Sequence, residues 1–584
     1  MIIHALKEYY DRKVLDPNSG IAPEGFELKE LQFVIVIDES GCLVSIDDLR
    51  EKRGNRLVGK TYLLPQSKGR SGSKSYETVF FLWDHLGYVL GLPEDDKKSA
   101  LQHQAWIDQL NNLPEQLTND VAIRAMKAFY ESDEVKKAKT HPMIEECLKS
   151  QTRNVTFRLV GDVPVPCRPA VQKFIEERLE RDVEGASDDV RHCMITGRKG
   201  TVSRIHSQTP IGKDSKVLVG FQKNSGYDSY GKEQGFNAPM IASTEFAYTT
   251  ALNTLLRSQD QKMVIGDTTF LFWSKKPSTL ETSMLSMFGE PPRDNPDAYT
   301  NEIKSLILSA QSGAYVERNN DNRFYVLGLS PNVARISVRY WYDGTVDEVK
   351  ERISDYFRDF EIVKPEWEMK YYSIWRVLVN VSVQDKSENI PPRLVGDLIR
   401  SVFEGTVYPA GLLNAAIRRI RSDTDNRVKP VRAAAIKAYL NRYYRFNPNA
   451  NFKEVSMALD VNQPSIGYQL GRLFSTLERI QEDANPGLNA TIRERYYGAA
   501  SSSPITVFPN LLKLKVHHIA KLRQQQMGKA VNYEKILSEI IGKVDQFPSH
   551  LMLHDQGMFA LGYYHQQQRF FTKRQDPEVQ DEEK

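Results

Sequence analysis

The chain has 584 residues, which is enough for two to four domains with their own buried cores. It carries 78 Lys and Arg against 75 Asp and Glu, a net charge of +3, so any contact with nucleic acid must come from local basic patches. Its 4 cysteines are far apart, which excludes a disulfide scaffold and a cysteine-rich zinc site and fits a reducing cytoplasm. There is no run of 18 apolar residues and no signal-peptide pattern, so we expect a cytoplasmic protein without membrane contact, metal or other cofactor.

The first half of the chain alternates between helix and strand patterns. Apolar spacing predicts a helix over 2–12, and short apolar runs predict strands over 33–37, 42–46 and 61–64. A dense apolar run predicts a buried helix over 80–90, and charged periodic patterns predict helices over 94–150. Further strands are predicted over 216–221 and in a hairpin over 263–273.

The second half changes from strands to helices. Residues 276–300 are rich in Pro, Ser, Thr and Asp and are predicted to be a linker, and 323–329 and 335–341 are predicted strands. Thr345 and Glu348 have the spacing of a capping box at the start of a helix. Helical patterns then run over 395–445, 453–484, 506–527, 531–541 and 549–570.

These patterns predict a multidomain α+β fold, with a mixed amino-terminal region followed by an all-α carboxy-terminal helical bundle. We expect an α+β domain over 1–275, a linker with a smaller α+β subdomain over 276–390, a basic helical segment over 391–456 and a helical bundle over 457–584.

One basic segment lies in 50–74, where glycines and serines alternate with Lys and Arg. Glycine lets a backbone approach phosphate, serine donates hydrogen bonds to it, and Gln66 can reach a base edge. The same composition is typical of a solvated surface loop, and the residues alone leave both interpretations open. The candidate DNA-motif contacts are Gln66, Lys68, Arg70, Ser71, Gly72, Ser73 and Lys74, and the candidate backbone contacts are Lys52, Arg53, Arg56 and Lys60.

A second segment, 191–240, places basic residues among glycine-rich turns. Asn237 precedes Ala-Pro, and an amide presented rigidly can read adenine. The alternative, which the residues alone favour, is that Gln234 and Asn237 satisfy backbone groups in an irregular turn. We take these two as candidate motif contacts and Arg204 and Lys232 as candidate backbone contacts.

A third segment, 414–445, holds nine basic residues against two acidic ones, with tyrosines between them. This pattern suits a nucleic-acid backbone with exposed bases, or else a solvated helix face with tyrosines in the core. The candidate backbone contacts here are Arg418, Arg419, Arg421, Lys429, Arg432 and Arg442, and those in the carboxy-terminal bundle are Arg493, Arg495, Lys513 and Lys521.

Several separate runs, in a fixed order, match one family of proteins. They are 9–10 (Tyr-Tyr), 63–72 (Leu-Leu-Pro-Gln-Ser-Lys-Gly-Arg-Ser-Gly), 81–84 (Phe-Leu-Trp-Asp), 88–92 (Tyr-Val-Leu-Gly-Leu), 192–197 (His-Cys-Met-Ile-Thr-Gly), 229–234 (Ser-Tyr-Gly-Lys-Glu-Gln), 237–239 (Asn-Ala-Pro), 467–474 (Gly-Tyr-Gln-Leu-Gly-Arg-Leu-Phe) and 488–496 (Leu-Asn-Ala-Thr-Ile-Arg-Glu-Arg-Tyr). Together they resemble the Csd-one family, the large subunit of type I-C Cascade, a CRISPR RNA-guided DNA surveillance complex.

The resemblance implies a non-catalytic subunit that recognises a protospacer-adjacent motif in duplex DNA and promotes duplex opening and R-loop formation. It implies as partners the CRISPR guide RNA, target double-stranded DNA, the handle-binding and backbone subunits, and the helicase-nuclease that docks afterwards. It also implies a small subunit translated from within the same reading frame, for which Met457 is the predicted start and Met527, expected inside a helix, a poorer one.

The alternative is an enzyme that cleaves nucleic acid, either a guide-RNA endonuclease or a DNA nuclease. The sequence contains no His-Glu-x-x-His and no Gly-x-Ser-x-Gly run, and no acidic cluster singles out a nuclease site. We therefore expect a protein that is not an enzyme.

Overall fold

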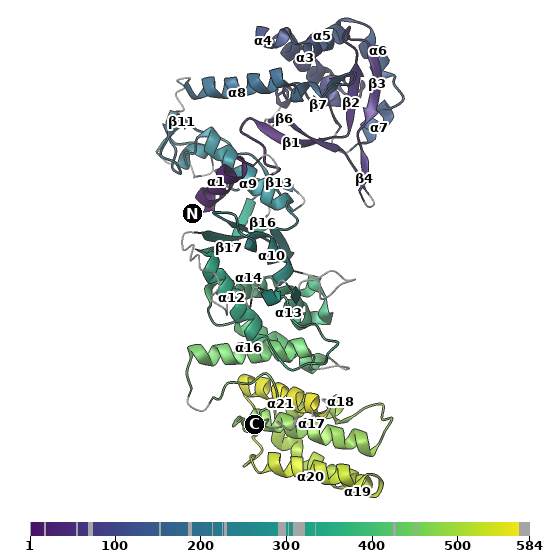
Figure 1. Ribbon diagram of the computed structural model, residues 1–584, viewed down its shortest axis with the longest axis vertical. Coiled ribbons are helices and arrows are strands. Elements are labelled where there is room, and N and C mark those ends of the chain that lie inside the picture. The colour runs from purple at the N-terminus through teal and green to yellow at the C-terminus, as the bar shows by residue number, and fades with distance from the viewer. Residues whose placement is uncertain are drawn as a thin grey trace, which may run out of the picture. The chain divides into compact units, whose positions relative to one another are not determined.

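The computed structural model describes residues 2–571 except 17–18, 54–55, 68–69, 71–73, 151–152, 185–189, 213, 225, 227–229, 290–299, 302, 306, 308–321, 333–334, 424–427 and 450–451. The chain forms two compact units (Figure 1). Unit 1 is Met1–Arg257 with Ala334–Ile336, and unit 2 is Ser258–Val333 with Ser337–Lys584. The predicted α+β fold class is confirmed, because unit 1 mixes helices with short strands and the chain beyond residue 345 is helical.

Unit 1 is built around short sheets covered by helices. Its strands are β1 Phe26–Leu31, β2 Phe33–Ile37, β3 Leu43–Asp48, β4 Glu51–Arg53, β5 Arg56–Val58, β6 Lys60–Pro65, β7 Asp84–His85, β8 Asn154–Val155, β9 Phe157–Leu159, β10 Val190–His192, β11 Lys199–Thr201, β12 Thr209–Ile211 and β13 Asp214–Lys216. Its helices are α1 Ile2–Lys13, α2 Leu86–Val89, α3 Lys97–Asn111, α4 Glu115–Thr118, α5 Val121–Glu131, α6 Glu134–Lys139, α7 Ile144–Lys149, α8 Pro169–Glu184 and α9 Ala242–Arg257.

The centre of unit 1 is strand β2, and every residue of it is buried. It pairs antiparallel with β3 and parallel with β9, and α5 packs against it. Helix α5 begins where the Asp120 carboxylate accepts hydrogen bonds from the backbone N–H groups of Ala122 and Ile123. The helix predicted over 2–12 and the strands predicted over 33–37, 42–46 and 61–64 are confirmed, to within a few residues at their ends.

Two predictions in unit 1 are wrong. The apolar run 80–90 is not one helix, since Asp84 and His85 form a strand with β8 and only Leu86–Val89 is helical. Leu82 has a φ of 62°, which interrupts any helix there. An apolar run of this kind can be buried as a strand or a turn as readily as a helix. Apolar composition without a clear period does not distinguish between these structures. The strand predicted over 216–221 ends at Lys216.

Unit 2 combines a four-stranded antiparallel sheet with a large helical region. The strands, in sheet order, are β14 Lys262–Ile265, β15 Thr268–Ser274, β16 Arg323–Asn332 and β17 Arg335–Thr345. The helices are α10 Leu280–Phe288, α12 Val346–Asp359, α13 Ile374–Val381, α14 Pro392–Glu404, α15 Ala410–Ser422, α16 Pro430–Phe446, α17 Ile466–Ala484, α18 Ile492–Ala500, α19 Phe508–Gln525, α20 Met527–Ile541 and α21 Leu553–Phe571.

The hairpin over 263–273 and the capping box are confirmed: the Thr345 hydroxyl accepts from the Glu348 N–H, and the Glu348 carboxylate accepts from the Thr345 N–H. The prediction of a linker over 276–300 is wrong for Leu280–Phe288, because these residues form helix α10. Its apolar side chains pack into the core, so that apolar spacing outweighs the polar composition around it. Helix α17 begins at Ile466, not at 453, because the backbone N–H and carbonyl of Val455 are bonded to the side chain of Asn441 instead of to helical neighbours.

One hydrophobic core runs through unit 2 from Met263 to Tyr564. The predicted boundaries at 391 and 457 therefore do not coincide with a break in the core, and the division into four segments stays a prediction. Helices α17 and α21 lie side by side over most of their length (Figure 1). We call α17–α21 the carboxy-terminal bundle.

Candidate nucleic-acid interface

The loop after β6 begins on firm backbone contacts. The Gln66 N–H donates to the Gly25 carbonyl over 2.8 Å, and the Ser67 N–H donates to the Glu27 carboxylate over 2.7 Å. Lys74 is exposed and lies 3.6 Å from Glu77. The other predicted motif contacts of this loop, Lys68, Ser71, Gly72 and Ser73, lie outside the described residues.

Arg70 turns inward from this loop. Its guanidinium pairs with the buried carboxylate of Asp84, donates to the Thr78 carbonyl over 2.8 Å and lies 3.7 Å from the ring centre of Phe80. Burial raises the pKa of Asp84, and the hydrogen bond from Arg70 offsets part of that increase. Contact of Arg70 with DNA stays a prediction, and the structure adds an internal role for the side chain.

The predicted residues of the 191–240 segment come together. The Arg204 guanidinium donates to the Gln234 side-chain oxygen over 2.9 Å, and the Asn237 amide donates to the carbonyls of Lys232 and Gln234, each over 3.1 Å. Gly235 lies directly on the Ser203 carbonyl, where a Cβ atom would have no room. The amide of Asn237 therefore holds the turn, which is the structural role that the sequence left open, while the side chains of Arg204 and Lys232 are exposed.

A cavity of about 600 Å³ in unit 1 joins the two segments. Gln66, Ser67 and Arg70 line one side of it, and residues 205–208 line another. Helix α9 closes it with Phe246, Thr249, Asn253 and Arg257, among others. Segments more than a hundred residues apart in the sequence thus share one polar recess.

The buried side chain of His206 lines this recess, and the buried carboxylate of Glu245 is bonded to the lining residue Ser207. The His206 Nδ1 lies 2.6 Å from the Tyr248 hydroxyl, and the Glu245 carboxylate accepts from the Ser207 N–H over 2.7 Å. Burial lowers the pKa of His206 to about 4 and raises that of Glu245. Neither side chain was predicted, since no sequence pattern links His206 to a tyrosine 42 residues later.

The remaining basic candidates of unit 1 lie on the β4–β5 hairpin and next to it. Lys52 and Lys60 are exposed, and the Lys60 ammonium lies 5.6 Å from the ring centre of Tyr62. Arg53 and Arg56 are paired in register across the two strands. Figure 1 shows the hairpin pointing away from α3–α5 of the same unit.

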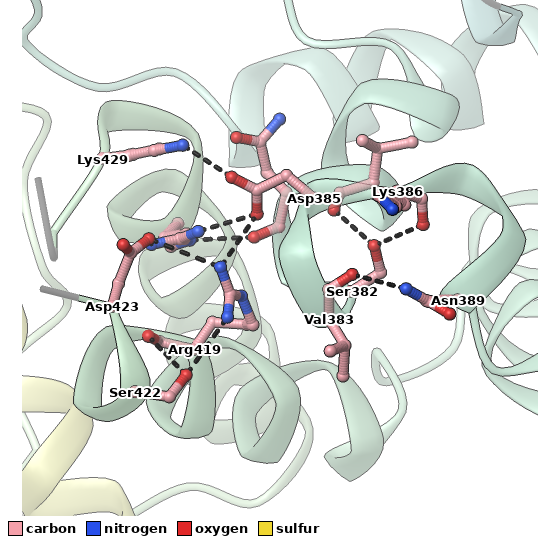
Figure 2. A network of polar contacts seen from close by, with 12 residues as sticks. Ser382, Val383, Asp385, Lys386, Asn389, Arg419, Ser422, Asp423 and Lys429 are labelled. Carbon is pink, nitrogen blue, oxygen red and sulfur yellow. Dashed lines mark hydrogen bonds and ion pairs between the residues drawn. The ribbon is translucent and has the colours of Figure 1, made fainter. Parts of the chain in front are cut away.

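The basic segment 414–445 is largely internal. Arg432 is fully buried and donates to Asp423 and Asp385, each over 2.8 Å, while Lys429 donates to Asp385 over 2.6 Å. Arg419 lies 3.5 Å from Asp385 and 3.4 Å from Asp423, so that three cations surround two carboxylates (Figure 2). We call these five residues the Asp385 cluster.

A second buried carboxylate, Asp359, neutralises the end of helix α16. Arg442, which is also buried, lies 3.7 Å from it, Arg445 lies 2.7 Å from it, and the Lys437 ammonium donates to its backbone carbonyl over 2.9 Å.

The interpretation of 414–445 as an unshielded basic surface is therefore corrected. A charge count over the segment alone omits Asp359 and Asp385, which come from elsewhere in the fold. Arg432 and Arg442 are closed off from nucleic acid in this structure, whereas contact through the exposed Arg418 and Arg421 stays a prediction.

In the carboxy-terminal bundle, Arg495, Lys513 and Lys521 are exposed, and Lys521 donates to Asn485 over 2.8 Å. Arg493 is less exposed and pairs with Glu494 at 3.0 Å and Glu478 at 3.7 Å. The run 488–496 contains a second capping box, in which Thr491 and Glu494 start helix α18.

Among the described residues, no group of three or more His, Cys, Asp or Glu side chains could hold a metal ion. In the same part of the chain, no helix is both long and apolar enough to cross a membrane.

The fold is that of a large α+β chain with a polar recess in unit 1, whose lining includes Lys29, Arg70 and Arg257. A family model described as CRISPR-associated protein (Cas_Csd1) matches residues 6–571. The chain belongs to the Csd1 family of CRISPR-associated proteins, and the resemblance stated from the sequence is confirmed. No curated protein matches the chain.

Proposed function

We propose that the chain is the non-catalytic large subunit of a type I-C Cascade complex. In this proposal unit 1 recognises the protospacer-adjacent motif in double-stranded DNA and promotes duplex opening and R-loop formation. Base pairing to the guide then reads the target sequence, while the protein reads only a short motif, a division of labour known from another RNA-guided effector.

One observation carries the proposal beyond family membership. The loop at Gln66, which contains predicted DNA contacts, and residues 205–208, which belong to the second predicted segment and follow its candidate Arg204, line the same recess of unit 1. The exposed cations Arg204 and Lys232 belong to the second segment and supply the neutralising charge that a phosphate backbone needs.

The partners in this proposal are the guide RNA, the target DNA, the handle-binding and backbone subunits, a small subunit and the helicase-nuclease, for which the chain provides a docking surface in the cytoplasm. The direct test is binding of the assembled complex to duplexes with and without the motif. Equal affinity for both would remove motif recognition from the chain.

Replacing Lys68 and Lys74 with alanine in the assembled complex is expected to weaken duplex binding. The slope of log affinity against log salt concentration should fall by about 2, because each lost phosphate contact releases one counterion fewer. Arg70 is left intact, since its removal would leave the buried Asp84 carboxylate without its ion-pair partner. The matched control is Lys97→Ala with Lys98→Ala on helix α3, two exposed lysines of the same unit. An unchanged slope in the loop variant, or an equal change in the control, contradicts the assignment.

A free small subunit beginning at Met457 is expected to copurify with the complex. Met457 is 48% exposed and precedes helix α17, so that a chain starting there keeps the whole carboxy-terminal bundle. Met527 is helical, as the first residue of α20 rather than the last of the helix predicted over 506–527, and a start there would leave only α20 and α21. The Tyr564 hydroxyl donates to the Val363 carbonyl over 2.7 Å, so a free bundle would present this face for docking.

Intact mass measurement of complexes from the unmodified reading frame, beside Met457→Leu, tests this start. A fragment of 128 residues (584 − 457 + 1) that disappears in the variant supports it. If the fragment is absent or survives the substitution, the start lies elsewhere.

The competing function, cleavage of nucleic acid, is tested with the purified chain. Labelled guide RNA and DNA are incubated with it and Mg²⁺ or Mn²⁺. Cleavage that purification does not remove would replace the non-catalytic proposal.

A further inference from the structure

The recess of unit 1 contains two buried polar atoms that nothing in the described part of the chain satisfies. They are Nε2 of His206 and Oδ1 of Asn253. Both residues line the cavity. Buried polar atoms in folded proteins almost always have a hydrogen-bond partner, so two such atoms at one cavity point to a ligand that supplies the partners.

His206 offers a hydrogen-bond donor. The side chain is 4% exposed, and burial lowers its pKa to about 4, so the imidazole is neutral at pH 7. Burial raises the pKa of Tyr248, so its phenol stays protonated and can donate to His206 Nδ1 or accept from it over 2.6 Å; we assign the phenol as the donor. The single proton of the neutral ring then lies on Nε2, the atom without a partner.

Asn253 offers a hydrogen-bond acceptor. Its Nδ2 donates to the Gln208 carbonyl over 3.3 Å, which fixes the orientation of the amide. In the reverse orientation two oxygens would face each other. The Oδ1 atom therefore needs a donor from the ligand.

The rest of the cavity suits a flat, partly apolar group with a negative charge. Phe26 and Phe246 contribute apolar walls, and the exposed Arg257 is a cation at the rim. A nucleobase has apolar faces and an edge where donors and acceptors alternate, and its phosphate is an anion. A donor, an acceptor, aromatic walls and a cation are the groups that hold one nucleotide.

We propose that this cavity receives a single unpaired nucleotide of the target DNA, extruded beside the motif when the duplex opens. The proposal rests on the proposed function, because the DNA-motif candidates Gln66 and Arg70 line the same cavity and place it next to the expected duplex. His206 donates to the base, Asn253 accepts from it, and Arg257 neutralises the phosphate.

The first experiment needs no complex and no motif. The full-length chain is titrated with each of the four deoxynucleoside 5′-monophosphates, and binding is followed by saturation-transfer NMR. Saturable binding of at least one of them is expected, with about a tenfold loss in Asn253→Leu and in His206→Phe. The control is Asn111→Leu, an exposed position at the end of helix α3 and outside the cavity.

Stability separates a binding role from a structural one. Each substitution removes a polar atom that lacks a partner, but also one hydrogen bond, to the Tyr248 hydroxyl in His206→Phe or to the Gln208 carbonyl in Asn253→Leu. The two effects on the unfolding free energy oppose each other, so the thermal midpoint of the chain is expected to change little. A fall in stability that parallels the loss of binding would give these side chains a structural role and overturn the proposal.

The second experiment locates the nucleotide. In the assembled complex, 2-aminopurine is placed in turn at positions beside the motif on each DNA strand. One position is expected to report an unstacked base, with its signal changed in Asn253→Leu but not in Asn111→Leu.

If motif binding and duplex opening are normal while no position responds, only the cavity assignment fails. If the complex does not recognise the motif, the proposed function fails, and the mononucleotide titration still decides the cavity. Binding restricted to free mononucleotides, or to guide RNA, overturns the DNA assignment.

Discussion

Replacing Gly471 with alanine is expected to destabilise the carboxy-terminal bundle by about 3 kcal/mol or more. Helices α17 and α21 cross with their backbones in contact at this glycine. A Cβ atom on Gly471 would overlap the Phe559 carbonyl oxygen and lie 2.7 Å from the Tyr563 nitrogen. Neither atom can move away as a flexible side chain would, so the helices must separate and lose packing along their length.

The same contact explains part of the run 467–474. Gly467 lies against the Asp555 carbonyl, and Gly562 on α21 lies against the Tyr468 carbonyl, so glycines of both helices make the close approach. Urea denaturation followed by tyrosine and tryptophan fluorescence measures the loss of stability.

The matched control is Gly498→Ala in helix α18. A Cβ atom there meets nothing within 4 Å, so alanine should stabilise the helix by about 0.5–1 kcal/mol. If Gly471→Ala is as well tolerated as Gly498→Ala, the close crossing of α17 and α21 is wrong.

Replacing Arg432 with methionine is expected to cost about 3–5 kcal/mol of unfolding free energy. The side chain is fully buried and donates to Asp385, to Asp423 and to the Asn380 carbonyl. Methionine fills similar space but leaves these three acceptors without the guanidinium that donates to them. Charge reversal at Arg432 would therefore report on folding and could not test contact with nucleic acid.

The loss of unfolding free energy caused by Arg432→Met should depend on pH. Burial raises the pKa of Asp385, but the Lys429 hydrogen bond and the Arg432 charge outweigh it and hold the pKa below its ordinary value. A carboxylate with a lowered pKa contributes its full stability above the unfolded-state value of about 3.9, and this contribution is lost as the pH falls through the folded-state pKa. The difference in unfolding free energy between the parent chain and Arg432→Met should therefore become smaller below about pH 4.

Arg418→Met is the control for the Asp385 cluster, since Arg418 is an exposed arginine of the neighbouring helix α15. It should change stability by no more than about 0.5 kcal/mol. Adding Asp423→Asn to Arg432→Met should recover part of the loss, because one uncompensated carboxylate is removed. A small effect of Arg432→Met at neutral pH would contradict the buried ion-pair network.

Local patterns were sufficient where a short segment decides its own structure. Thr345 and Glu348 cap helix α12 reciprocally within one helical turn. Strand β2 is a short run of residues that is apolar on both faces. The run 80–90 failed because its apolar residues have no single period, and the position of Asp84 depends on Arg70 and on strand β8.

Charge was the property that sequence described least well. Nine basic residues in 414–445 predicted an exposed surface, yet Asp359 and Asp385 approach from outside the segment and bury Arg432 and Arg442 with them. The recess was also hidden, since Gln66, His206 and Asn253 meet only after strands and helix α9 have packed.

The fold class, the helices and strands with a clear period, and the family could all be predicted from the amino-acid sequence, because they depend on the order and local spacing of residues. The exposure of each cation, the glycines at the helix contact and the recess shared by two distant segments became visible in the folded chain alone. Electrostatic pairing and close packing act between residues that are near in space, whatever their separation along the chain.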